Sequence, residues 1–213
     1  MRSLSMITAP PCQPMRLVGC GILHKEVDHL IRKNGWPLEA HYLDSTLHNH
    51  LDRLSSQLNQ ALDQETQQQH DTIVFYGCCH PRMENYLDHH HTLRTQGQNC
   101  IVMLLGHERF VEELEEGSYF LLEDWALCWR PMLASVFGTN RSVVQEIFHA
   151  SHKRIVAVQT SCSGDFRHEA QAAADYLALP LRWMHVSLDH LETVLMEAIA
   201  RKAADQTERM PHG

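Results

Sequence analysis

Four of the seven cysteines in this 213-residue chain follow predicted strands. They are Cys20, Cys79, Cys100 and Cys162. Three come directly after an apolar run, and the fourth lies just past a shorter one. In an open α/β sheet, groups just beyond the carboxyl ends of the strands face a common crevice. Thiolates gathered there, with His48 and His80 as neighbours, would suit a metal ion, a metal-containing cofactor or thiol chemistry.

A metal site is the first interpretation, with the ligands Cys20, Cys79, Cys100 and His48. These cysteines lack CxxC spacing, so the ligands would come from different strand ends rather than from one short motif. Cys100 and Cys162 each precede a predicted helix, a position that favours the thiolate. Zinc or iron would suit these ligands, and three cysteines with one other ligand could also hold an iron–sulfur cluster.

The sequence Cys78-Cys79-His80 is the densest group. Neighbouring side chains at a strand end point in opposite directions, so we expect Cys79 in the crevice and Cys78 in the core. His80 would be a ligand or a base for Cys79, and Glu26 would orient a ligand or transfer a proton. The alternative is a metal-free thiol enzyme in which Cys79 is the nucleophile and His80 or His48 its base. Whether the protein is an enzyme at all stays open.

Residues 161–165 form a turn of small polar residues between a predicted strand and a predicted helix. The backbone amides of Cys162, Ser163 and Gly164 could hold the anionic group of a cofactor. The turn lacks both the Walker lysine and the dinucleotide GxGxxG pattern. Anion binding here would therefore follow neither of these two phosphate-binding motifs.

Histidine is unusually frequent, with 17 residues in the chain. Three are adjacent, His89, His90 and His91, and resemble a metal-binding tract. Consecutive side chains on a helix or strand diverge, so three neighbouring histidines rarely bind one ion. We expect a solvated turn that binds nickel or zinc only adventitiously.

The elements that must position these residues alternate between strands and helices. Apolar runs predict strands at residues 15–23, 38–43, 72–76, 92–95, 154–159 and 181–186, with an edge strand at 119–122. Asp44 or Ser45 would cap a long helix with an apolar stripe from Leu47 to Leu62. The pattern predicts an α/β fold: a single three-layer domain whose mostly parallel sheet of about six strands has helices on both faces. Residues 100–105 either begin a helix capped by Asn99 or form a strand, which would move Cys100 to the opposite sheet edge.

Composition and charge limit the compartment of the protein and the classes of partner that it can bind. We expect a leader over residues 1–14, one domain over 15–204 and a tail over 205–213. The leader is a poor signal peptide, and the longest apolar runs fall far short of the ~20 residues of a membrane helix. A formal net charge of −8 and the lack of a basic run argue against nucleic-acid and membrane partners. An odd number of cysteines without disulfide spacing predicts a cytoplasmic protein.

Five short motifs occur along the chain in a recognisable order. They are Cys20-Gly21-Ile22-Leu23 with Glu26, Leu47-His48-Asn49, Tyr76-Gly77-Cys78-Cys79, Cys100-Ile101 with Leu104-Leu105-Gly106, and Gly117-Ser118-Tyr119 through Trp125. Their order resembles DUF1638, a family of bacterial and archaeal proteins of unknown function. The similarity runs over about residues 17–125 and is weaker in the C-terminal third. Together the motifs are specific for the family and say little about function.

Two departures from the family pattern bear on the site. Gln98 and Asn99 stand where the family has His-Asp, and His80 replaces a glycine. If the family's histidine or aspartate is a ligand, His80 is the candidate replacement here. The resemblance also implies an association with corrinoid-dependent methyl transfer and other metallocofactor systems. A corrinoid is therefore a further cofactor candidate, and an accessory protein serving a metalloenzyme or methyltransferase is the implied role. A non-catalytic adaptor with core cysteines is the third class.

Overall fold

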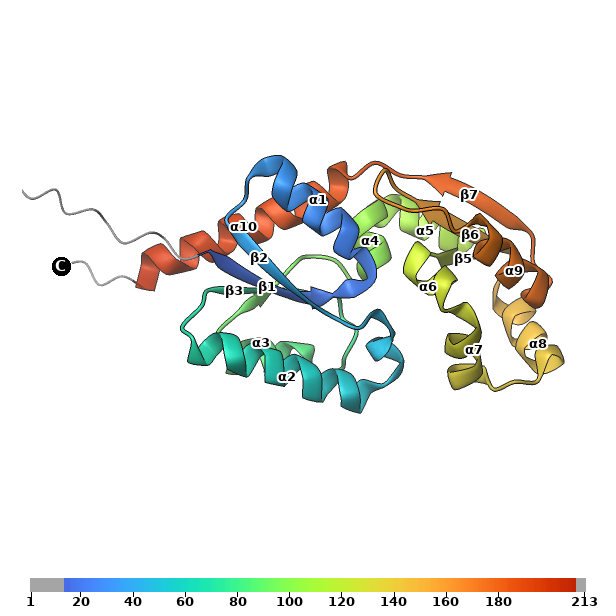
Figure 1. The fold of residues 1–213 in the computed structure, drawn as a ribbon, viewed down its shortest axis with the longest axis horizontal. Coiled ribbons are helices and arrows are strands. Elements are labelled where there is room, and N and C mark those ends of the chain that lie inside the picture. The colour runs from blue at the N-terminus through green and yellow to red at the C-terminus, as the bar shows by residue number, and fades with distance from the viewer. Residues whose placement is uncertain (1–13, 210–213) are drawn as a thin grey trace, which may run out of the picture.

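Seven strands form two parallel sheets in the computed structural model, which describes residues 14–209 (Figure 1). The first sheet has the order β2-β1-β3-β4, and the second has the order β5-β6-β7. The strands are β1 (Met15–Cys20), β2 (Leu38–Leu43), β3 (Thr72–Phe75), β4 (Leu93–Arg94), β5 (Ser118–Leu121), β6 (Arg154–Gln159) and β7 (Leu181–His185). The α/β class and the parallel pairing agree with the sequence prediction.

The prediction of one six-stranded sheet is wrong, because the first sheet ends at β4. This strand has only two residues and pairs with β3 on one side. Its outer edge is covered by the C-terminal helix, from which Arg201 Nη2 donates to the Arg94 carbonyl at 2.8 Å. A side chain thus satisfies the edge where a further strand would have to pair. The alternation of apolar residues along a strand does not reveal that a distant helix covers the edge of the sheet.

The described chain also has twelve helical segments, of which the last follows the final strand. The first six are η1 (Gly21–Leu23), α1 (His24–Asn34), η2 (Ser45–Asn49), α2 (Leu51–Gln67), α3 (Met83–His89) and α4 (Cys100–Leu105). The other six are α5 (His107–Glu115), α6 (Glu123–Leu127), α7 (Trp129–Phe137), α8 (Arg141–Ser151), α9 (Arg167–Leu177) and α10 (Asp189–Arg209). The ambiguous run at residues 100–105 is therefore a helix.

Three hydrophobic clusters show how the layers pack. One cluster lies between the first sheet and helices α2 and α3, and another between the second sheet and α7 to α9. The largest is continuous across both sheets, joining Phe75 of β3 and Val156 of β6 with Leu191 of α10. Figure 1 shows α10 leaving the second sheet and running back along the first. The two sheets thus share one apolar layer.

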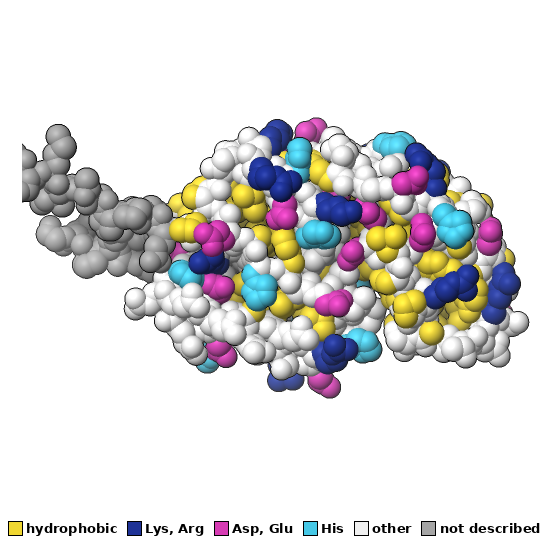
Figure 2. Space-filling model, viewed as in Figure 1, with side chains coloured by type: hydrophobic (Ala, Val, Ile, Leu, Met, Phe, Trp, Pro, Cys, Tyr) yellow, Lys and Arg dark blue, Asp and Glu magenta, His cyan; other side chains and the backbone are white. Residues whose placement is uncertain are grey.

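The C-terminal helix extends further along the chain than the sequence predicted. Helix α10 continues past Asp205 to Arg209, where the sequence analysis placed a tail. Residues 1–13 of the expected leader and residues 210–213 lie outside the described residues. Within the described range, no helix is both long enough and apolar enough to cross a membrane. Figure 2 shows acidic and basic side chains interspersed over the face that it displays.

Candidate functional site

Three thiols and one imidazole line a single cavity of about 200 Å³ at the carboxyl edge of the first sheet. Cys20 ends β1, Cys79 follows β3, and Cys100 begins α4. The lining includes Cys20, His48, Tyr76, Cys79, Cys100 and Trp125. The structure therefore brings together the four side chains that the sequence suggested as metal ligands.

The sheet register and one glycine place the thiols together. β1 and β3 are adjacent parallel strands, so their carboxyl ends share one edge. A Cβ atom at Gly77 would lie 2.3 Å from the Gln98 carbonyl oxygen and 2.6 Å from the Asn99 Cα atom. Only glycine permits this approach. The loop before α4 therefore rests on the end of β3, and Cys100 reaches the cavity.

Asn99 fixes the start of α4. Its side-chain oxygen accepts a hydrogen bond from the Val102 amide at 2.9 Å, which is an N-cap interaction. The first residue after this cap is Cys100. The position predicted for a capped helix is thus the observed one, and Cys100 stays on the same sheet edge as Cys20 and Cys79.

His48 is held as a neutral imidazole with a free lone pair. It lies in η2, and its Nδ1 atom is 2.7 Å from the Ser45 carbonyl oxygen. Because a carbonyl only accepts, Nδ1 carries the proton and Nε2 does not. Burial lowers the pKa of His48, which keeps the ring neutral. A fixed tautomer of this kind is the usual state of a metal-binding histidine.

The second part of the chain closes the cavity through α6. Asp124 accepts a hydrogen bond from the Ser45 hydroxyl at 2.5 Å, which fastens α6 to η2. The next residue, Trp125, packs its ring 5.4 Å from the ring of His48. The cavity is therefore built from loops of the first sheet and from the helix after β5.

The thiols are held in their protonated form. Burial raises the pKa of Cys20 to about 12, and it also raises the pKa values of Cys79 and Cys100. The negative charge of one thiolate would further raise the pKa of its neighbours. At Cys100 burial outweighs the helix N-terminus that was expected to favour the thiolate. This environment opposes the metal-free thiol enzyme, whose nucleophile must ionise near neutral pH.

Two buried hydrogen-bond donors at this cavity have no partner. Among the described residues, buried side-chain polar atoms without a hydrogen bond are Tyr76 Oη, Trp125 Nε1, Arg182 Nε and Arg201 Nε. The first two belong to residues that line the cavity. A buried donor left unsatisfied costs about 1–3 kcal/mol. The cavity is thus suited to a guest that offers hydrogen-bond acceptors.

The spacing of the thiols limits what that guest can be. A tetrahedral zinc ion with Zn–S bonds of about 2.3 Å brings its sulfur ligands to within about 3.8 Å of each other. In the described chain, the only three His, Cys, Asp or Glu side chains whose ligand atoms all lie within 4.8 Å are Asp63, His89 and His90. The cavity ligands are therefore more widely spaced than one small ion requires.

Glu26 and the turn after β6 form a separate polar group. The Thr160 hydroxyl donates to the buried Glu26 carboxylate at 2.6 Å, and the Cys162 amide donates to that hydroxyl at 3.1 Å. The Ser163 hydroxyl accepts from the Thr160 amide at 3.0 Å. None of these residues is among those that line the thiol cavity. Glu26 is therefore placed to organise this turn rather than to serve the thiols.

The amide of Gly164 already has an anionic partner. It donates to Glu123 Oε2 at 3.0 Å, and Glu123 Oε1 accepts from the Lys25 ammonium at 2.6 Å. Burial raises the pKa of Cys162, so this thiol is not activated either. Glu123 holds the place that the predicted anion would take, and cofactor binding by residues 162–164 stays a prediction.

His80 and Cys78 lie outside the cavity. His80 is buried, but its Nδ1 atom accepts from the Arg82 amide at 3.0 Å and its ring packs on Tyr86. It is not among the residues that line the cavity with Cys79, and its role as a base stays a prediction. Cys78 was expected in the core; it is exposed instead, and Arg94 Nη2 lies 3.4 Å from its sulfur.

Tyr76 and Trp125 are the site residues that sequence reasoning missed. Tyr76 was treated as the end of a strand, and Trp125 as core or lid. Both have an apolar ring with one polar tip, a combination that usually finds a hydrogen-bond partner when buried. Their position beside predicted strand ends was the available signal, but only the structure reveals the missing partners.

The comparison with known proteins gives a family and no activity. The model of a family described as "Protein of unknown function (DUF1638)" matches residues 42–195. The chain belongs to the DUF1638 family. The matched range holds His48, Tyr76, Cys79, Cys100 and Trp125, whereas Cys20 precedes it. No curated protein and no solved structure matches the chain.

Proposed function

We propose that this DUF1638 protein binds a metal-containing cofactor through Cys20, Cys79 and Cys100, with His48 as the fourth ligand. The observation that carries the proposal is the pairing of these ligands with unpartnered donors around one cavity. Thiols and a neutral imidazole are the ligands of zinc, copper and iron centres. A bound metal would replace the thiol protons, which burial otherwise retains.

An iron–sulfur cluster fits this cavity better than a single zinc ion. The ligand spacing exceeds that of one tetrahedral ion, and three cysteines with a histidine can hold a cluster. The sulfur atoms of a cluster accept hydrogen bonds, which matches the Tyr76 hydroxyl and the Trp125 indole N–H. When bound, such a group supplies one-electron chemistry. A corrinoid fits less well, because 200 Å³ is below the volume of ordinary small-molecule sites.

Each residue that lines or supports the cavity has a defined role in this proposal. The three thiols and His48 Nε2 bind the group, and the Ser45 carbonyl keeps the imidazole in the right tautomer. Tyr76 and Trp125 donate to acceptor atoms of the group and exclude water from it. Burial raises the pKa of Tyr76, so its hydroxyl remains a donor. Gly77 holds the ligand loops at the required distance.

We also propose that the protein works in the cytoplasm as an accessory to a metalloenzyme or a methyltransferase. All six cysteines in the described range are free thiols, which suits a reducing compartment. The partner class rests on the family resemblance alone. A catalytic role would require an open coordination position, and His48 is the ligand whose loss would create one.

Elemental analysis with a visible spectrum tests the proposal on tag-free protein purified without oxygen. We expect about one equivalent of cofactor and an iron–sulfur absorption band. Cys79→Ser should abolish both, whereas the matched control Cys78→Ser, one residue away and exposed, should retain them. A colourless, metal-free and folded wild-type protein would refute metal binding. Equal loss in both variants would refute the assigned ligands.

A further inference from the structure

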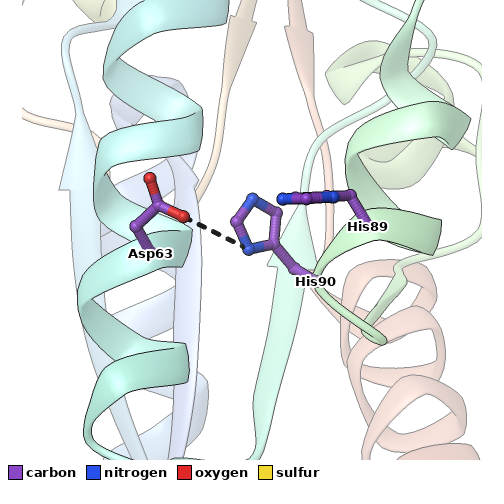
Figure 3. Close-up of side chains that lie close together, drawn as sticks. All are labelled: Asp63, His89 and His90. Atoms are coloured by element: carbon purple, nitrogen blue, oxygen red, sulfur yellow. Dashed lines mark ion pairs between the residues drawn. The ribbon is translucent and has the colours of Figure 1, made fainter.

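Asp63, His89 and His90 form a second group of ligands, far in the fold from the thiols. One ligand atom from each lies within 4.8 Å of the others. Asp63 belongs to α2, His89 ends α3, and His90 follows it (Figure 3). His90 precedes β4 and so lies toward the amino edge of the sheet, whereas the thiols lie at the carboxyl edge. The two sites are therefore distinct.

The end of α3 explains how two adjacent histidines can face one point. The helix stops at His89, and His91 adopts a positive φ of 49°. The chain turns at His90, and the rings of His89 and His90 stand at 87° with their centroids 4.8 Å apart. Figure 3 shows both rings on the side that faces Asp63. The divergence expected of consecutive histidines is thus removed by the turn.

Hydrogen bonds fix the lone pair of His90. Asn59 Nδ2 donates to the Ser55 carbonyl at 2.9 Å, so its Oδ1 atom faces His90 Nε2, 3.3 Å away. An amide oxygen only accepts, so Nε2 carries the proton and Nδ1 keeps a lone pair. That atom lies 3.8 Å from Asp63 Oδ1. This arrangement, with the remote nitrogen held by an oxygen acceptor, is typical of metal-binding histidines.

The three ligands differ in burial: His90 is fixed inside the protein, whereas Asp63 is open to solvent. The side chain of His90 is only 3% exposed, whereas that of Asp63 is 59% exposed. The buried ring was unexpected, since the sequence predicted a solvated turn. The hydroxyl of Thr66 lies 3.4 Å from His90 Nδ1, a long contact that an ion can replace. A metal can therefore enter from solvent and meet one ligand that is already in place.

We propose that Asp63, His89 and His90 bind a divalent transition metal that links α2 to α3. Two imidazoles and one carboxylate suit zinc, nickel, copper or ferrous iron rather than calcium or magnesium. Water would complete the coordination. The ion joins two helices that cover the same face of the first sheet, so binding should stabilise the fold.

The test is a zinc titration of the full chain carrying Cys79→Ser, which removes the thiol site from the measurement. We expect one equivalent of Zn²⁺ to bind and an excess to raise the melting temperature. Adding Asp63→Ala or His89→Ala should weaken zinc binding at least tenfold and remove the thermal shift. Both residues are exposed, so neither variant should unfold.

His91→Asn is the matched control, because asparagine tolerates a positive φ and His91 is not among the three ligands. It should bind zinc as the parent does. Unchanged affinity in the Asp63→Ala and His89→Ala variants would overturn the proposal, as would an equal loss in His91→Asn, which indicates an adventitious histidine tract. A negative result here would not bear on the thiol site. That site is tested separately, by the metal content that the purified protein loses in the Cys79→Ser variant.

Discussion

The carboxyl edges of the two sheets differ in whether their polar groups have hydrogen-bond partners within the protein. Beside the first sheet, the buried donors of Tyr76 and Trp125 lack partners, and both residues line the cavity that also holds three thiols. Beside the second, the turn after β6 bonds to its own hydroxyls and to Glu26 and Glu123. Both edges lie where α/β proteins place their ligands. Among the described residues, buried donors without a partner occur beside the cavity of the first edge and not in the turn of the second, and we therefore assign the cofactor to the first.

Cysteine substitutions at the two edges should give the largest contrast. Cys100→Ser removes a ligand from the first edge, and cofactor content should fall by at least tenfold. Cys162→Ser changes the second edge and should leave the content unchanged. Metal analysis of both proteins after identical anaerobic purification makes the comparison. If Cys162→Ser loses as much cofactor as Cys100→Ser, the two edges form one site and the contrast fails.

Gly77→Ala should separate the ligand loops of the first edge. The added Cβ atom would collide with the Gln98 carbonyl and with Asn99, so the loop before α4 must move. We expect cofactor affinity to fall about 10- to 100-fold, as when the support of a metal ligand is lost. Reconstitution with increasing iron and sulfide measures it. Gly35→Ala is the control for backbone strain without a collision, because the φ of 61° is costly for alanine but the added Cβ would meet no atom within 4 Å. Normal loading of the Gly77→Ala protein would show that the close approach is dispensable.

At the second edge, Thr160→Val should affect stability and not binding. It removes the donor to the buried Glu26 carboxylate, which lowers the free energy of unfolding by about 1–3 kcal/mol. Urea unfolding measures this loss, and metal analysis should find wild-type content. A stable Thr160→Val protein that has lost its cofactor would instead assign Glu26 to the site.

Tyr76→Phe should stabilise the protein without cofactor and weaken its binding of the cofactor. Without cofactor, the variant loses an unsatisfied buried hydroxyl, so its free energy of unfolding should rise by up to about 1–3 kcal/mol. With cofactor, it loses a hydrogen bond to the bound group, so affinity should fall. Unfolding curves of apo and reconstituted protein measure the two effects. A variant less stable than wild type in both states would show that the hydroxyl has a structural partner.

Acid should weaken the fold modestly, because the buried His80 and the half-buried His152 resist protonation. Burial lowers the pKa values of His80 and His152 below the ordinary value of about 6.5. As pH falls below about 6.5, the unfolded chain takes up protons first, so the free energy of unfolding decreases. His80→Asn should reduce this decrease in urea unfolding between pH 7.5 and 5. An identical pH dependence in wild type and His80→Asn would contradict the assignment to His80.

The sequence was sufficient to predict the elements but not how they assemble. Apolar runs gave residues 38–43 and 154–159 the bounds that β2 and β6 have. Asn99 predicted the capped helix at Cys100 as one of two readings. The division into two sheets depends on the short β4 and on the Arg201 contact with its edge. Such a long-range contact leaves no local pattern.

The sequence also predicted the part of the candidate site that follows from the order of the parallel strands. Parallel strands place Cys20 and Cys79 at one edge, so their meeting follows from the fold. The roles of His80 and Cys78 depended on the path of a loop, which alternation along a strand does not determine. The missing partner of Trp125 depends on α6 docking against η2 through Asp124. Packing between distant segments decides these features.

X-ray absorption at the metal edge tests the central claim most directly. The sample is full-length, tag-free protein purified without oxygen and carrying Asp63→Ala, so that the histidine site does not contribute. Our account predicts sulfur neighbours at about 2.3 Å, together with a short metal–metal distance if a cluster is bound. These signals should vanish in the Cys79→Ser variant. A metal surrounded only by nitrogen and oxygen would contradict the account.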